Sequence, residues 1–203
     1  MEINIYFIIS IIITIIFLYL INFSYKWKIL IFSLMAIIIW IYTYYWDNIL
    51  TLTHFDQDKI IETYIQATLE EIIKIWLAIW IYKFIIKKDF SKVYFTSVVS
   101  FAMLELLLYS YNNNYTFIDF YQRLTIPVSV HLFLGYFFLF NVIILWKNKY
   151  FYFFIITLIH FLYNFSMQLP LAPVISIAFL ILFVLFSIYF YYQTNIFNKN
   201  INN

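Results

Sequence analysis

The stretch TLEEIIKIW, residues 68–76, places two adjacent glutamates and a lysine inside a long apolar segment. Glu70 and Lys74 are four residues apart and Glu71 and Lys74 are three apart, so either carboxylate can pair with the ammonium on a helix. A charged side chain at the centre of a membrane-spanning helix costs about 2.5–3.5 kcal/mol on insertion scales. Such charges normally face a bundle interior or a wet cavity, and by default they indicate a functional site.

Further polar side chains lie within the neighbouring apolar segments, namely Glu105, His131, His160 and Asn164. With 1.5 Å of rise per residue on antiparallel helices, we expect them at similar depths. His160 and Asn164 share one helix face, as do His131 and Gly135, the single glycine of the chain. We therefore expect one polar site, with Gly135 allowing a close approach by another helix or by a substrate backbone.

These residue types suit the hydrolysis of an amide by activated water. The reaction needs a water pocket, a base and hydrogen-bond donors for the tetrahedral oxyanion. The chain has no cysteine and no nucleophile-elbow motif, so nucleophilic catalysis is disfavoured. We expect Glu70 or Glu71 to act as the base, aided by His131, while His160 and Asn164 donate hydrogen bonds to the oxyanion.

Two further charged residues are expected to support this chemistry. Lys74 would hold one glutamate ionised, and Glu105 would orient a histidine or share a proton with the glutamate pair. A metal alternative also exists, because His131, His160 and Glu105 would suit zinc with an open water position. No HExxH motif is present, so the sequence favours the metal-free mechanism and no cofactor is expected.

The composition of the 203-residue chain is that of an integral membrane protein. It is 66% hydrophobic and only 11% charged, with a mean hydropathy of +0.89. Soluble domains are about 45–50% apolar and about 25% charged, so this chain has too few polar groups to cover a surface in water. The net charge of +2 is too small and dispersed to indicate a nucleic-acid partner. The expected surroundings are the lipid bilayer.

Seven apolar segments have, or nearly have, the length of about 20 residues that a spanning helix needs. They predict an all-α, multi-pass helical bundle that forms a single domain over residues 1–203. Lysines follow every second segment, which predicts an N-terminus outside and a C-terminus inside the cell membrane, with the polar site in the outer half. The segments are 3–21, 29–46, 60–86, 93–111, 124–146, 150–167 and 174–192.

Four short motifs on successive segments resemble the PrsW family of membrane proteases, relatives of the CAAX prenyl protease and bacteriocin-processing superfamily. The motifs are EEIIK (70–74), FAMLE (101–105), HLFLG (131–135) and HFLYN (160–164), and together they span about half of the chain. In the CAAX-type branch the first motif usually ends in arginine and the second in histidine. Lysine and glutamate stand there in this chain, which favours the PrsW side.

The resemblance implies an intramembrane endopeptidase, with Phe101 and Gly135 as supporting residues of the site. It implies a membrane-anchored protein or peptide as the substrate, such as an anti-sigma-type factor. A proton-coupled transporter or channel is the main alternative, because intramembrane glutamates and histidines also form proton relays. A non-proteolytic relative that binds peptides or lipids or confers immunity, and a prenyl-protein endopeptidase, are the others.

Overall fold

A computed structural model of the chain describes residues 5–21, 23–53, 59–87, 89–112, 117–144 and 148–166, together with 178, 181 and 185. Every regular element within these residues is helical, so the prediction of an all-α fold is confirmed. The helices are α1 (Ile5–Leu20), α2 (Tyr25–Thr53), α3 (Lys59–Ile81), α4 (Phe90–Asn112), α5 (Phe117–Phe138) and α6 (Lys149–Ser166). α3 and α5 continue into the π-helical turns η2 (Tyr82–Ile86) and η3 (Leu139–Ile144).

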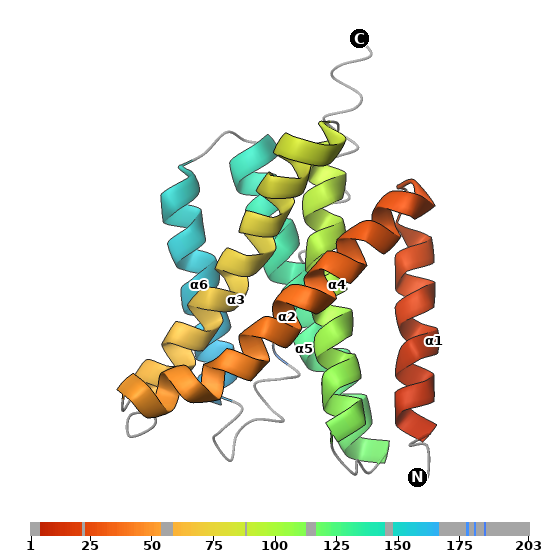
Figure 1. The fold of residues 1–203 in the computed structure, drawn as a ribbon. Coiled ribbons are helices and arrows are strands. Elements are labelled where there is room, and N and C mark those ends of the chain that lie inside the picture. Colours follow the sequence, from red (N-terminus) through yellow and green to blue (C-terminus); the bar gives the residue numbers. More distant parts are fainter. Residues whose placement is uncertain are drawn as a thin grey trace.

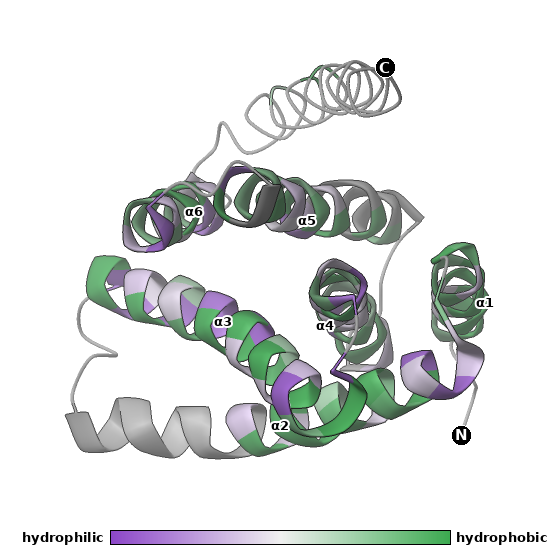
Figure 2. Cartoon of the chain, turned by 90° about the horizontal axis from the view of Figure 1, so that it is seen from above, coloured by the Kyte–Doolittle hydropathy of each residue, from purple (hydrophilic) through white to green (hydrophobic). Residues whose placement is uncertain are grey.

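The helices form three layers when the molecule is seen from above (Figure 2). α2 lies on one side, α3, α4 and α1 form the middle layer, and α5 and α6 lie on the other side. α4 is central and packs against α1, α2, α3 and α5, whereas α3 packs most extensively against α6 and also contacts α4 and α2. α3 and α4 run in opposite directions, as do α5 and α6 (Figure 1). Side chains between the middle layer and α5 and α6 are therefore enclosed on several sides.

Two of the described helices are long and apolar enough to cross a membrane, judged by length and composition. They are Tyr25–Tyr42 at the start of α2 and Phe90–Tyr111 in α4. Ile5–Leu20 and Pro127–Val142 are apolar but shorter. α3 does not meet the same standard because its centre carries three charged residues. These lengths and compositions are consistent with association with a membrane.

The predicted boundaries agree well for four segments and differ for two. Segments 3–21, 60–86, 93–111 and 150–167 correspond to α1, to α3 with η2, to α4 and to α6. Segment 29–46 is too short, because α2 runs from Tyr25 to Thr53. The predicted start of the fifth segment at 124 is wrong, because α5 begins at Phe117. The polar residues before 124 are typical of a connection, but a helix can continue past the end of its apolar stretch. The seventh segment lies outside the described residues, apart from 178, 181 and 185, which are helical and exposed.

Lys28 is a buried lysine that closes the corner between α1 and α2. Its Nζ donates to the backbone oxygens of Leu18 at 2.6 Å and Tyr19 at 3.2 Å, at the end of α1. The last carbonyls of a helix lack partners within the helix and carry partial negative charge. The ammonium satisfies two of them and thereby fixes the end of α1 to the start of α2.

The Lys28→Met substitution is expected to lower the free energy of unfolding by about 1.5–3 kcal/mol, which is the usual worth of hydrogen bonds to a charged group. It should also accelerate amide hydrogen exchange in the last turn of α1. Lys26→Met is the matched control, because Lys26 is exposed, and such surface changes stay within about 0.5 kcal/mol. Equal losses in the two variants, measured by denaturation in detergent, would show that the cap contributes nothing.

Gly135 lies at the contact between α5 and α4. A Cβ atom at this position would lie 2.7 Å from Cγ1 and 2.9 Å from Cγ2 of Val98, a fully buried residue of α4. Valine is stiff at χ1, so its methyl groups have little freedom to turn away. Of the two reasons expected for this glycine, the close approach of another helix is the one that the geometry displays.

Gly135→Ala is expected to lower the free energy of unfolding by about 1–3 kcal/mol, the usual cost of overpacking a tight interior. The double variant Gly135→Ala/Val98→Ala should recover part of that loss, because the smaller residue removes the clashing methyl groups. Thermal unfolding followed by circular dichroism provides the measurement. An unchanged stability of Gly135→Ala would contradict the tight contact.

Candidate functional site

The middle of α3 carries a buried ion pair. Glu70, Glu71 and Lys74 are 5%, 0% and 0% exposed, and Lys74 Nζ lies 2.5 Å from Glu71 Oε1. Large apolar residues of the same helix, Trp76 and Ile79, are exposed. α3 therefore turns its charged face inward and an apolar face outward, which is the reverse of a helix on the surface of a soluble protein.

His160 of α6 connects the two glutamates. Its Nδ1 lies 2.8 Å from Glu71 Oε1, and its Nε2 lies 3.4 Å from Glu70 Oε2. An ionised carboxylate only accepts hydrogen bonds, so we assign the Nδ1 proton of His160 to the bond with Glu71. The Nε2 atom is then directed toward Glu70.

His131 of α5 lies between Lys74 and a third glutamate. Its Nδ1 is 3.1 Å from Lys74 Nζ, and its Nε2 is 2.6 Å from Glu105 Oε2. An ammonium group has donors but no acceptor, so Nδ1 must accept and we assign the ring proton to Nε2, which donates to Glu105. The ring of Phe101 lies 5.2 Å from the His131 ring and 5.0 Å from Lys74 Nζ, in the range of a cation–π contact.

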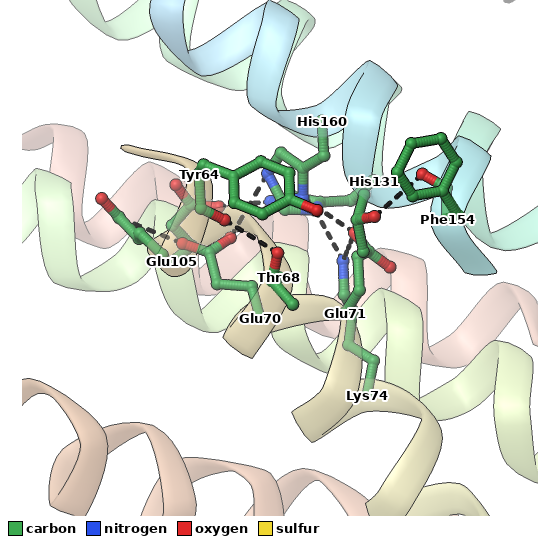
Figure 3. A network of polar contacts seen from close by, with 11 residues as sticks. Tyr64, Thr68, Glu70, Glu71, Lys74, Glu105, His131, Phe154 and His160 are labelled. Carbon is green, nitrogen blue, oxygen red and sulfur yellow. Dashed lines mark hydrogen bonds and ion pairs between the residues drawn. The ribbon is translucent and has the colours of Figure 1, made fainter. Parts of the chain in front are cut away.

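These contacts form one continuous polar chain across four helices (Figure 3). Its members in order are Glu105, His131, Lys74, Glu71, His160 and Glu70. The helices α4, α5, α3 and α6 each contribute at least one of them. Opposite charges attract far more strongly in a buried site than in water, and removing one partner of such a pair leaves an uncompensated charge. The charged side chains of this polar chain therefore depend on one another for partners.

A pocket of about 250 Å³ lies beside Glu70 and Glu105, between α2, α3 and α4. Glu70 Oε1 accepts a hydrogen bond from Gln66 at 3.0 Å, whereas Glu70 Oε2 is buried without a hydrogen-bond partner among the described residues. The 3.4 Å approach of His160 to that oxygen is an ion-pair distance without hydrogen-bond geometry. Both ends of the polar chain therefore reach the same pocket. The other described lining residues are Ile39, Tyr42, Gln66, Phe101, Leu108 and Tyr109.

The donor atoms that lie closest together do not fit a zinc site as they stand. Glu70, His131 and His160 each offer one atom within 4.8 Å of the others, so Glu70 takes the place that the sequence suggested for Glu105. Both ring nitrogens of His131 are already engaged, by Lys74 and by Glu105. A metal ligand needs a free ring nitrogen, and the adjacent ammonium would repel a cation.

Two residues expected in the site take no part in the polar chain. Asn164 lies one turn beyond His160 on α6, is half-buried, and makes no hydrogen bond within the described part of the chain. Gly135 serves helix packing. Conversely, sequence reasoning missed Gln66 and Tyr42. The position of Gln66 four residues before Glu70 is a usable signal, but nothing distinguishes Tyr42 among the twenty tyrosines of the chain.

The arrangement contains two of the parts that amide hydrolysis requires, a carboxylate that can act as a base and a pocket beside it. The Glu70 carboxylate borders the pocket, the imidazole of His160 stands next to it, and the Glu71 carboxylate orients that imidazole. No family model, curated protein or solved structure matches the chain. The chemistry of these side chains is therefore the main basis for a function.

Proposed function

We propose that the chain is an intramembrane endopeptidase that hydrolyses a membrane-anchored protein or peptide by glutamate-activated water. The observation that carries this proposal is Glu70, a buried carboxylate that lines a pocket with one oxygen unpartnered among the described residues and His160 beside it. The resemblance of the four motifs to the PrsW family supports the same class. An anti-sigma-type substrate rests on that resemblance alone.

Glu70, and not Glu71, is the proposed base. Glu71 Oε1 is held by Lys74 and by His160, and Glu71 is not among the described residues that line the pocket. The pocket that Glu70 borders has room for water, whose share of the liquid is about 30 Å³ per molecule. A water bound there transfers a proton to Glu70 while its oxygen forms the bond to the carbonyl carbon of the substrate.

The second half of the reaction returns that proton. The tetrahedral intermediate collapses, the carbon–nitrogen bond breaks, and the leaving nitrogen receives the proton from Glu70. Glu71 keeps His160 oriented by accepting from its Nδ1, as the aspartate does for the histidine in serine protease triads. Asn164, one turn from His160, is the proposed donor to the oxyanion. The products are a carboxylic acid and an amine.

We place this site in a multi-pass bundle of about seven spans in the cell membrane, with the N-terminus outside and the C-terminus inside. The composition supports a membrane location, as do the two helices that are long and apolar enough to span it. α3 turns its charged face inward and its apolar face outward, which also supports a membrane location, since exposed Trp76 and Ile79 suit lipid contact. The lysines that follow every second predicted span support the orientation.

A proton-coupled transporter is the second candidate, and the continuous polar chain is the observation that favours it. A transmembrane relay must, however, open to opposite sides of the membrane, whereas Glu105 and Glu70 line one pocket. Proton flux into liposomes that contain the purified protein distinguishes the two functions. Flux driven by a pH gradient, without any peptide product, would favour the transporter.

The proposal is tested by comparing membrane proteomes of cells that carry the wild-type chain or the Glu70→Gln/Glu71→Gln variant. We expect at least one membrane-protein fragment with a new terminus in the wild type and its absence in the variant. Immunodetection of equal amounts of both proteins in the membrane is the control for folding. A fragment that persists with both carboxylates neutralised would refute the mechanism.

Treatment with a membrane-permeant chelator is expected to leave cleavage by the purified protein unchanged, because both ring nitrogens of His131 are occupied by protein partners. The measurement is the rate of release of the fragment identified in the proteome comparison. A rate that falls on chelation and recovers on adding zinc would contradict this expectation, and would mean that Lys74 or Glu105 releases His131 to a metal.

A further inference from the structure

We propose that the pocket between α2, α3 and α4 binds a cationic group of side-chain size, so that the peptidase cleaves beside a lysine or arginine of its substrate. The cleavage preference rests on the proposed function. The binding of the cation does not, because it follows from the walls of the pocket alone.

The charge of the pocket wall is the first reason. Glu70 and Glu105 both line the pocket, and none of the lining residues that the structure describes is a lysine, an arginine or a histidine. Glu70 is nine-tenths buried or more, and its Oε2 lacks a hydrogen-bond partner among the described residues. A buried carboxylate oxygen without a donor is unfavourable. Two carboxylates on one pocket wall repel each other, and an ammonium or guanidinium group of a ligand offsets that repulsion, with Glu105 as its main partner so that Glu70 remains available to the water.

The site's own ammonium does not meet this need. Lys74 is fully buried, donates to Glu71 and to His131 Nδ1, and is not among the described lining residues. Its hydrogen bonds within the described part of the chain therefore go to Glu71 and His131, and none goes to Glu70 or Glu105. Figure 3 shows the same separation, with Glu70 and Glu105 on one side of the cluster and Lys74 on the other.

The remaining walls suit the stem of a long basic side chain. Tyr42, Phe101 and Tyr109 contribute aromatic rings, which attract cations through their π faces, while Ile39 and Leu108 contribute apolar surface. Lysine and arginine have such a form, with an apolar stem and a charged head. The volume of about 250 Å³ is below the roughly 300–1,000 Å³ of pockets for drug-sized ligands, so one side chain is the fitting occupant.

The binding test uses the purified protein in detergent with two probes of equal shape, n-pentylguanidinium and the neutral n-pentylurea. We expect the cation to bind about tenfold more tightly or better, since a tenfold preference corresponds to about 1.4 kcal/mol. Ligand-induced shifts of thermal unfolding, measured across a concentration series, give both affinities. Equal affinities of the two probes for the wild-type protein would overturn the proposal.

Glu105→Gln and Glu70→Gln are each expected to abolish most of this preference while leaving the binding of n-pentylurea unchanged. Glu62→Gln is the matched control, because Glu62 lies on α3 outside the described lining of the pocket, and it should retain the preference. A preference that survives in both pocket variants would place the cation elsewhere, for example on the detergent surface, and would also overturn the proposal.

A second measurement separates this inference from the proposed function. Quenched fluorescent peptides that carry lysine or its uncharged analogue norleucine at successive positions are offered to the wild type and to Glu105→Gln. We expect norleucine beside the cleaved bond to lower kcat/KM about tenfold in the wild type, with little effect in the variant. Cleavage without a preference for lysine would reject the inference and retain the peptidase. Selective binding of the cation without cleavage of any peptide would support the inference and reject the proposed peptidase.

Discussion

Glu70→Gln is expected to lower kcat for peptide cleavage by about 10²–10⁴-fold, the usual contribution of a general base. Glutamine preserves the shape of the side chain and still accepts the hydrogen bond from Gln66, but its amide oxygen takes no proton from water. KM should change little for substrates without a basic residue, because Glu70 acts on the water. Initial rates over a range of peptide concentrations provide both constants.

Glu62→Gln is the control on the same helix, and we expect its kcat to match that of the wild type. The thermal unfolding midpoint of Glu70→Gln should lie near that of the wild type, which separates lost chemistry from lost structure. A folded Glu70→Gln protein that cleaves peptide at the wild-type rate would rule out Glu70 as the base, and Glu71 would then become the candidate.

Lys74→Met is expected to cause the largest loss of stability, about 3–5 kcal/mol in the free energy of unfolding, because removing one partner of a buried ion pair leaves an uncompensated charge. The charge left behind is that of Glu71, which is 0% exposed. The same change removes the donor to His131 Nδ1. Equilibrium unfolding in mixed detergent micelles gives the difference.

The double variant Glu71→Gln/Lys74→Met should recover a large part of this loss, because no charge then remains without a partner at that position. Lys92→Met is the matched control. Lys92 forms the same i, i+3 type of pair with Asp89 at 3.3 Å, but both side chains are exposed, and such pairs contribute about 0–1 kcal/mol. Similar losses for Lys74→Met and Lys92→Met would mean that burial does not strengthen the inner pair.

The helical fold and the residues of the polar chain follow from the sequence because both depend on simple regularities. Apolar stretches of sufficient length predict helices, and a charge within such a stretch must find a polar partner. Glu70, Glu71 and Lys74 violate the apolar pattern so clearly that an enclosed polar region is the natural expectation. Depth along antiparallel helices then indicated which other residues, such as His131 and His160, lie at the same level.

The rotation of each helix about its axis is what the sequence does not specify. Consecutive residues differ by about 100° around a helix, so Glu70 and Glu71 face different neighbours, and the packing of α3 on α6 and α4 decides which one lines the pocket. The contribution of Tyr42 depends on the path of α2 across α3 and α4 (Figure 1). Such a path results from packing between distant segments and leaves no local pattern in the chain.

The polar chain begins at Glu105 and ends at Glu70, and both residues border a single pocket. In the proposed peptidase, a proton accepted on one wall is thus given back to the compartment from which it came. No net charge crosses the bilayer during a catalytic cycle, so turnover is electrically silent. We therefore expect the cleavage rate of the proposed peptidase not to depend on the membrane voltage.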